Sequence, residues 1–255
     1  MCIQCRQSVP NRRGFLSLAA AGIAASAAFG SGRAFAADTG PGTTPEEDQE
    51  NVANVPAAEA LARLKAGNAK YVEAPNVCAI NLLTLSEQRK QVAAKQKPFA
   101  AILTCADSRV PPELVFGGFG LGELFVARNA GNIADTATIG TIEYGVEHLG
   151  VRLVVVLGHQ RCGAVEAACD IVAKHATFPG AIGPMLGAIV PSALAVRGKP
   201  GDFIDNTVRE NATRTAMQIA SVSEIVAHFI RDHGVAVLPA RYDLDSGRVD
   251  FLLER

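Results

Sequence analysis

The sequence predicts a single-domain α/β fold whose mostly parallel central sheet, about four parallel strands plus a short antiparallel edge strand, is flanked by helices. Short apolar, β-prone runs alternate along the chain with longer segments in which apolar residues recur at helical spacing. One run, Leu153–Leu157, is apolar throughout, as expected of a parallel strand buried on both faces. Of the 255 residues 49% are hydrophobic, which is enough to fill a substantial core.

The first predicted elements are two helices and a strand. Apolar residues recur every three to five positions from Ala57 to Ala69, which predicts a helix that starts after Pro56. A second helix is predicted over Leu83–Lys95, and Pro98 ends it. The apolar run Phe99–Thr104 follows and is the first predicted strand.

The middle of the chain continues the alternation. A helix start is predicted at Pro111–Leu114, because proline fits the first turn of a helix. The predicted strand Glu123–Ala127 leads into Arg128–Asn132, a polar loop that contains glycine. Thr136–His148 has the apolar spacing of an amphipathic helix, and the buried strand Leu153–Leu157 comes next.

The last third of the chain completes the predicted fold. Gly163–Lys174 is predicted to be a helix, whereas Gly180–Gly201 is rich in glycine and proline and allows no assignment. Asn206–His233 has the pattern of one long helix or two, and Val235–Ala240 is a further predicted strand. An Asp-Ser-Gly turn then leads into a short final strand over Arg248–Leu253.

Residues 1–36 have the composition of an export signal. Arg12 and Arg13 are followed by Gly-Phe-Leu, a weakly apolar alanine-rich run and the small-residue stretch Ala34–Ala37. This order predicts a twin-arginine signal peptide that is cleaved after export, so the mature protein would be periplasmic or secreted. A single transmembrane anchor is the alternative, but glycines and Arg33 interrupt the apolar stretch.

The rest of the chain is predicted to be a flexible linker over residues 37–55, rich in Gly, Pro, Thr and acidic residues, and a folded domain over residues 56–255. The leader carries four arginines and no acidic residue, so the net charge of −1 becomes −5 without it. A mildly acidic mature chain argues against nucleic acid or an anionic membrane as the main partner. No membrane anchor is expected in the mature chain.

Four of the six cysteines lie outside the leader, at positions 78, 105, 162 and 169. In an exported protein they could form disulfides, and four cysteines allow three pairings. Cys105 and Cys162 each follow a predicted strand, however, and His159 lies near the second of them, which favours metal binding. We expect Cys78 and Cys169 to be structural residues.

Cys105, His159 and Cys162 form a predicted zinc site at the carboxyl ends of neighbouring strands, where open α/β sheets build their sites. Two cysteines and one histidine leave a fourth zinc position free, as in catalytic rather than structural sites. Asp107 could occupy that position or form a hydrogen bond with its occupant, and Arg109 could hold the carboxylate in a charge-assisted pair. An ordinary surface ion pair at a helix start is the alternative interpretation of these two residues.

Three motifs carry a resemblance to a known family. They are CADSRVP at Cys105–Pro111, GELFVARNA at Gly122–Ala130 and GHQRCG at Gly158–Gly163. Together they resemble the β-class carbonic anhydrases, and the resemblance runs from about Pro56 to Phe251.

The resemblance implies a role for each residue of the predicted site. One zinc ion per chain would bind Cys105, His159 and Cys162, while the pair Asp107–Arg109 would gate the fourth position. Asp107 would itself be the fourth ligand in a closed state. The implied substrate pocket is lined by four further residues, which are Gln96, Phe125, Ala130 and Tyr144.

The resemblance also implies the reaction, which is the reversible hydration of carbon dioxide to bicarbonate and a proton by a zinc-bound hydroxide. Zinc lowers the pKa of bound water from about 15.7 towards neutrality. Hydrolysis of carbonyl sulfide or carbon disulfide on the same zinc site is one alternative, and a zinc-containing binding or structural protein without turnover is another. The family generally assembles from dimers with pockets at the subunit interface, so Gln96 and Tyr144 would serve the zinc ion of the other chain in a homodimer or larger homo-oligomer.

Overall fold

The computed structural model describes residues 54–74 and 85–252. The chain divides into two units, Met1–Gly42 and Thr43–Arg255, and all described residues belong to the second. The predicted signal peptide, most of the predicted linker and Cys78 lie outside the described residues. Within the described part, no helix combines the length and the apolar character that are needed to cross a membrane.

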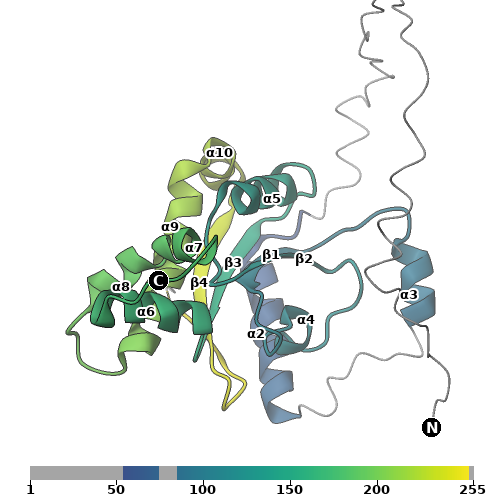
Figure 1. Cartoon of the computed structure of the whole chain (residues 1–255). Coiled ribbons are helices and arrows are strands. Elements are labelled where there is room, and N and C mark those ends of the chain that lie inside the picture. The colour runs from purple at the N-terminus through teal and green to yellow at the C-terminus, as the bar shows by residue number, and fades with distance from the viewer. Residues whose placement is uncertain (1–53, 75–84, 253–255) are drawn as a thin grey trace, which may run out of the picture. The chain divides into compact units, whose positions relative to one another are not determined.

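The described residues form a five-stranded sheet with the strand order β2-β1-β3-β4-β5 (Figure 1). The first four strands in this order are parallel, and β5 is antiparallel to β4. This arrangement confirms the predicted fold class, and each strand begins at the predicted residue or one residue after it. The strands are β1 (Ala100–Cys105), β2 (Leu124–Asn129), β3 (Leu153–His159), β4 (Ala236–Tyr242) and β5 (Val249–Phe251).

The helices lie in the predicted segments, and the structure settles the two points that the sequence left open. The segment 180–201, for which the sequence allowed no assignment, contains two short helices, and a proline in the first turn of α8 is compatible with its start. The segment Asn206–His233 is two helices, because Ser223 has an extended backbone and its hydroxyl accepts the Val226 N–H at 3.0 Å to start α10. The helices are α2 (Ala57–Glu73), α3 (Leu85–Val92), α4 (Pro112–Val115), α5 (Thr136–Glu147), α6 (Gly163–Lys174), α7 (Ile182–Gly187), α8 (Val190–Val196), α9 (Phe203–Val222) and α10 (Glu224–His233).

Helices cover both faces of the sheet, so its central strands are buried. β1 and β3 are buried along their whole length. Alternate residues of β1 point to opposite faces: Ala101 and Leu103 pack with α5, α9 and α10, whereas Ala100 and Ile102 pack with α2 and α4. This packing fixes the carboxyl ends of β1 and β3 side by side, and we call this side of the sheet the carboxyl edge.

A third apolar cluster lies at the carboxyl edge. It contains Cys105 and Cys162 together with buried residues of α6, α7, α8 and α9. Cys169 belongs to the same cluster, and its buried thiol donates to Thr207 Oγ1 at 3.3 Å, as expected of a residue that packs in the core. Cys105, Cys162 and Cys169 are all free thiols, so the structure contradicts a disulfide among these three.

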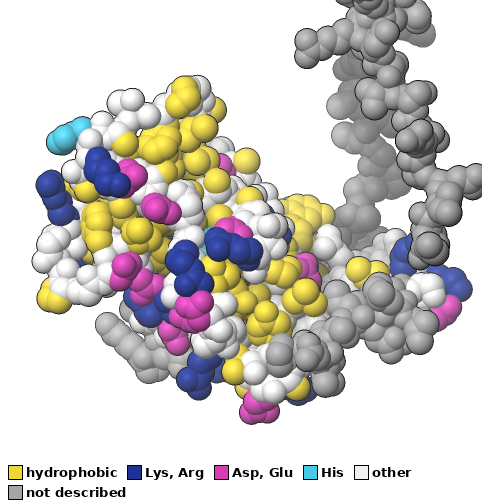
Figure 2. Space-filling view, turned by 60° about the horizontal axis from the view of Figure 1, so that its bottom comes forward, with side chains coloured by type: hydrophobic (Ala, Val, Ile, Leu, Met, Phe, Trp, Pro, Cys, Tyr) yellow, Lys and Arg dark blue, Asp and Glu magenta, His cyan; other side chains and the backbone are white. Residues whose placement is uncertain are grey.

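Charged side chains of opposite sign lie next to one another on the face shown in Figure 2, where hydrophobic side chains surround them. Ion pairs are common among the described residues, as in Arg161 with Asp245, at 2.7 Å, and Lys174 with Asp170, at 2.8 Å. The face in view therefore has mixed charge and presents no broad basic area.

Candidate metal centre

Three side chains of ligand type meet at the carboxyl edge. Cys105 is the last residue of β1, His159 is the last residue of β3, and Cys162 immediately precedes α6. One ligand atom from each residue lies within 4.8 Å of the others, and the two Sγ atoms are 3.8 Å apart. All three side chains are buried. The structure thus brings together the ligand set that the sequence predicted.

Among the described residues, one nitrogen of the His159 imidazole has no hydrogen-bond partner. Nδ1 lies 3.0 Å from the carbonyl oxygen of Gln160, to which it donates when it carries the proton. Nε2 is then a bare acceptor, buried and without a hydrogen-bond partner among the described residues. A buried acceptor in this state is unfavourable until it gains a hydrogen-bond donor or binds a cation, and a set of two sulfurs and one imidazole suits zinc. The residues present therefore fit a zinc ion.

The two thiols differ sharply in acidity. The hydrogen bond with Cys162 lowers the pKa of Cys105 to about 4, and His159 and the backbone N–H of Gly131 contribute to this shift. The hydrogen bond with Cys105, burial and the negative charge of Cys105 raise the pKa of Cys162. As a pair, the two thiols therefore lose the first proton readily and the second only with difficulty, and a divalent metal ion would favour the loss of both.

Arg109 binds the carboxylate of Asp107 at two points. Its Nε lies 3.0 Å from Oδ1 and its Nη2 lies 2.7 Å from Oδ2, while its backbone N–H donates to Oδ1 at 2.9 Å. These hydrogen bonds lower the pKa of Asp107 to about 2, so the carboxylate is ionised at neutral pH. Oδ2 of Asp107 also lies 3.8 Å from Nε2 of His159. The predicted pair therefore lies beside the ligand set, with the carboxylate held by the arginine.

Arg128 fixes the backbone between Cys105 and Asp107. Its Nε donates to the carbonyl oxygen of Cys105 at 2.9 Å, and its Nη2 donates to that of Asp107 at 2.6 Å. Sequence reasoning placed Arg128 in the GELFVARNA motif and at the start of a polar loop, whereas the structure extends β2 through Asn129 and so includes Arg128 in the strand. Its position could have been recognised from the parallel register, because Arg128 lies opposite Thr104 near the shared end of β1 and β2.

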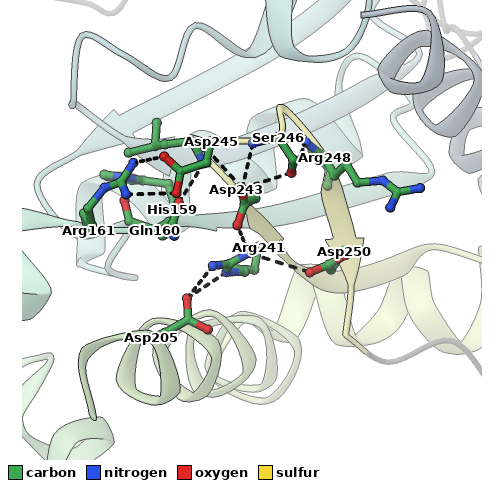
Figure 3. A network of polar contacts seen from close by, with 12 residues as sticks. His159, Gln160, Arg161, Asp205, Arg241, Asp243, Asp245, Ser246, Arg248 and Asp250 are labelled. Carbon is green, nitrogen blue, oxygen red and sulfur yellow. Dashed lines mark hydrogen bonds and ion pairs between the residues drawn. The ribbon is translucent and has the colours of Figure 1, made fainter. Parts of the chain in front are cut away.

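A second arginine–carboxylate pair joins residues 159–162, the metal loop, to residues 243–248, the β4–β5 turn (Figure 3). Arg161 donates to Asp245 through Nη1 at 3.0 Å and through Nη2 at 2.7 Å. Gln160 accepts the N–H of Leu244 at 3.1 Å and donates its own N–H to the carbonyl of Tyr242 at 2.9 Å. Sequence reasoning missed these contacts, because Arg161, in the GHQRCG motif, and Asp245, in the predicted turn, are 84 residues apart along the chain.

Ala130 is the implied pocket residue that lies beside the ligands. It belongs to the loop after β2, and the N–H of the next residue, Gly131, donates to Sγ of Cys105 at 3.4 Å. The side-chain amide of Asn211, on α9, donates to the carbonyl of Gly131 at 2.9 Å. The loop that carries Ala130 is thus fixed from both the ligand side and the helix side.

The other implied pocket residues lie towards the amino ends of the strands. Phe125 pairs with Ala101 near the start of β2, roughly 13 Å along the strand from Asn129 at the carboxyl edge. The ring of Tyr144 lies 6.2 Å from that of Phe125 between centroids, and it is 50% exposed. Gln96 is exposed and lies shortly before the first residue of β1. These three residues do not join the metal centre of their own chain.

Comparison with known sequences gives matches over most of the described residues. The family model of carbonic anhydrase matches residues 100–249. The chain is 38% identical over 163 residues to carbonic anhydrase 2 of Mycobacterium tuberculosis. The aligned region covers 64% of this chain and 78% of that protein. It is 33% identical over 187 residues to the carbonic anhydrase of Mycolicibacterium smegmatis, covering 73% and 89%.

Comparison with solved structures gives the same family. The β-carbonic anhydrase of Coccomyxa, determined in complex with acetazolamide, superimposes with a TM-score of 0.58 at 26% identity, covering 76% of this chain and 86% of that chain. A tetrameric β-carbonic anhydrase of Sordaria macrospora gives a TM-score of 0.60 at 22% identity, covering 72% and 95%, which shows a shared fold.

Proposed function

The chain belongs to the β-class carbonic anhydrase family, and from this premise we propose that its metal centre holds zinc and hydrates carbon dioxide reversibly to bicarbonate and a proton. The observation that carries the proposal is the set of three buried ligand atoms within 4.8 Å of one another, beside a carboxylate held by an arginine. Cys105, His159 and Cys162 would hold one zinc ion per chain. When bound, zinc would supply the Lewis acidity that makes water nucleophilic near neutral pH.

Asp107 is suited to orient the nucleophilic oxygen. Its carboxylate stays ionised because Arg109 lowers its pKa to about 2, so it only accepts hydrogen bonds. An oxygen that donates its hydrogen to Asp107 keeps a lone pair for the carbon of carbon dioxide. The attack forms a carbon–oxygen bond and moves an electron pair of one C=O bond onto its oxygen, which gives bicarbonate. The proton that the water loses beforehand passes to solvent.

Arg109 fixes the direction of that carboxylate. Two guanidinium contacts and one backbone contact hold Asp107, and such two-point pairs restrict orientation strongly. The short distance of 3.8 Å between Asp107 Oδ2 and His159 Nε2 supports the closed state as a second position of the same side chain. In that state Asp107 would leave Arg109 and become the fourth ligand. The ion pair between Arg109 and Asp107 would therefore decide whether the fourth zinc position is free.

A homodimer, or a larger homo-oligomer built from dimers, would complete the substrate pocket. The position of Phe125 roughly 13 Å along β2 from the carboxyl edge supports a pocket shared between two chains. Gln96 and Tyr144 of one chain would then face the zinc centre of its partner, with Gln96 donating a hydrogen bond to bicarbonate. The exposure of both residues is consistent with an interface.

Export by the twin-arginine route would place the enzyme in the periplasm or outside the cell. Arg12-Arg13, the alanine-rich run and the small residues before position 37 support a signal peptide over residues 1–36, with the folded domain after the linker. Replacing both arginines by lysine should leave the uncleaved chain in the cytoplasm. Fractionation and N-terminal sequencing would show this, and a cleaved, exported variant would contradict the proposed route.

Stopped-flow hydration of carbon dioxide by the purified mature chain tests the proposed activity. We expect rapid hydration that disappears when a chelator removes zinc and returns when zinc is added back. Carbonyl sulfide and carbon disulfide, assayed in parallel, should be poor substrates. A zinc-loaded oligomer without carbon dioxide hydration would contradict the proposed function.

A further inference from the structure

Arg161 has a left-handed backbone conformation in the middle of the metal loop. Its φ angle is +53°, between the ligands His159 and Cys162. Residues with a β-carbon rarely adopt this conformation, because the β-carbon approaches the following carbonyl oxygen. Glycine adopts it readily, but position 161 carries a long charged side chain instead. Contacts of the loop must offset this backbone cost, and the side chain of Arg161 makes two of them, both with Asp245.

The β4–β5 turn provides an anchored partner for Arg161. Oδ1 of Asp243 accepts the backbone N–H groups of Asp245 and Ser246 at 3.1 and 2.8 Å, and its Oδ2 accepts Nη1 of Arg241 at 2.8 Å. Arg241 is buried and also forms an ion pair of 2.7 Å with Asp205 on α9 (Figure 3). The carboxylate of Asp245 is thus presented to the metal loop from a turn that is fixed to the core.

The backbone of Arg161 also contacts the pair beside the ligands. Its carbonyl oxygen accepts a hydrogen bond from Nη2 of Arg109 at 3.2 Å, and the same nitrogen donates to Oδ2 of Asp107 at 2.7 Å. The direction of a carbonyl depends on the backbone angles of its residue. A change of conformation at position 161 would therefore remove one of the contacts that orient Arg109.

We propose that Arg161 and Asp245 are positioning residues, which hold the metal loop in its left-handed conformation and thereby orient Arg109 towards Asp107. The two side chains are 55% and 64% exposed, so their ion pair should contribute little to folding stability. Its effect would be on turnover instead. This inference rests on the function proposed above, because turnover is the property that the orientation of Asp107 controls.

Substitutions at position 161 distinguish the effect of the side-chain ion pair on turnover from the effect of the backbone conformation. Arg161→Ala and Asp245→Asn should each lower kcat about tenfold, with KM, zinc content and Tm close to those of the wild type. The double variant should lose no more than either single variant, because both break the same pair. Arg161→Gly should recover most of kcat, since glycine adopts the positive φ angle without the pair. Asp170→Asn, which breaks an exposed pair of 2.8 Å on α6, is the control and should leave kcat unchanged.

A measurement that does not depend on turnover accompanies these assays. The NMR signal of the Arg109 Nε–H group should exchange faster with solvent in Arg161→Ala and regain protection in Arg161→Gly. Wild-type kcat in Arg161→Ala, or equal losses in the alanine and glycine variants, would overturn the proposal. A loss of kcat that follows a lower Tm or lost zinc would overturn it too, because the role would then be structural. An inactive wild-type enzyme would contradict the proposed function instead, and the NMR comparison would still test the positioning role.

Discussion

The two ends of the same parallel strands differ in how complete their sites are. At the carboxyl edge, Cys105, His159 and Cys162 are buried, and the loops that carry them are fixed by hydrogen bonds within the chain. At the amino ends, Phe125 and Tyr144 contact each other, but Tyr144 is 50% exposed. One chain therefore suffices to bring the three ligand side chains together, whereas the ring of Tyr144 in the proposed pocket stays half exposed among the described residues. This difference separates the proposed metal binding from the proposed substrate binding, and each can be tested at its own end of the strands.

The largest effect is expected at the carboxyl edge, from loss of a ligand. Cys162→Ser replaces a thiolate by a hydroxyl that binds zinc far more weakly, so the variant should lose its zinc and its activity together. Metal analysis and carbon dioxide hydration on the same sample measure both. Cys169→Ser is the matched control, because this buried thiol contacts Thr207 at 3.3 Å and lies outside the ligand set. Full zinc content in Cys162→Ser would show that Cys162 is not a zinc ligand.

A smaller effect is expected when the ligands stay and the orienting carboxylate changes. Asp107→Asn should keep its zinc, but turnover should fall about 100-fold or more, because an amide neither pairs with Arg109 in the same way nor acts purely as an acceptor. Metal content and kcat distinguish this variant from Cys162→Ser. Unchanged turnover in Asp107→Asn would show that the carboxylate does not orient the nucleophile.

A loss of activity of intermediate size is expected from a substitution at the amino ends of the strands. This loss should concern the zinc centre of the partner chain. Gln96→Ala should lower carbon dioxide hydration about tenfold while zinc stays bound, because one hydrogen bond to substrate is lost. Mixing Gln96→Ala with zinc-free Cys162→Ser should then raise the activity per zinc ion. In a mixed dimer, the intact Gln96 of the second chain would serve the intact zinc centre of the first.

The mixing experiment also shows whether Gln96 acts on the zinc centre of the other chain. Each variant refolded with itself under the same conditions is the control, and light scattering reports that oligomers have formed. No gain in activity after mixing would mean that Gln96 serves its own chain or does not contact substrate at all.

The smallest effect concerns the stability of the turn that supports the metal loop. Asp243 accepts hydrogen bonds from Ser246 and Arg241, which lower its pKa to about 2, below its ordinary value of 3.8. The ionised carboxylate therefore stabilises the folded state above about pH 4, and this contribution is lost as the pH falls from about 4 to about 2. Asp243→Asn should lower the free energy of unfolding by about 1 kcal/mol at pH 7.

The difference between Asp243→Asn and the wild type should shrink in acid. Urea unfolding at pH 7, 4 and 3 measures it, and any loss of zinc in acid affects both proteins alike. A difference that stays constant down to pH 3 would show that the hydrogen bonds of Asp243 do not depend on its charge.

The strands and the ligand set could be predicted because their signals are local. The apolar runs before Cys105 and His159 identify strands, and parallel strands bring their carboxyl ends together. The ion pair of Asp107 with Arg109 could also be proposed, because the residues are two positions apart. The short helices α7 and α8 could not, since glycine and proline weaken helical periodicity in that segment.

The supporting contacts of the site depend on distances along the chain that no local pattern reveals. Arg161 meets Asp245 only after β4 has been placed beside β3 and the chain has turned towards β5. Arg128 reaches the carbonyls of Cys105 and Asp107 because of the register between β1 and β2. These contacts follow from the packed sheet, so the structure was needed to find them.

Anomalous diffraction at the zinc edge, from crystals of the mature protein, tests most directly whether Cys105, His159 and Cys162 hold the metal. We expect one peak per chain, about 2.3 Å from both Sγ atoms and about 2.0 Å from Nε2 of His159. A peak at other residues, or two bridged sulfur atoms in place of a peak, would contradict the zinc centre and the mechanism built on it.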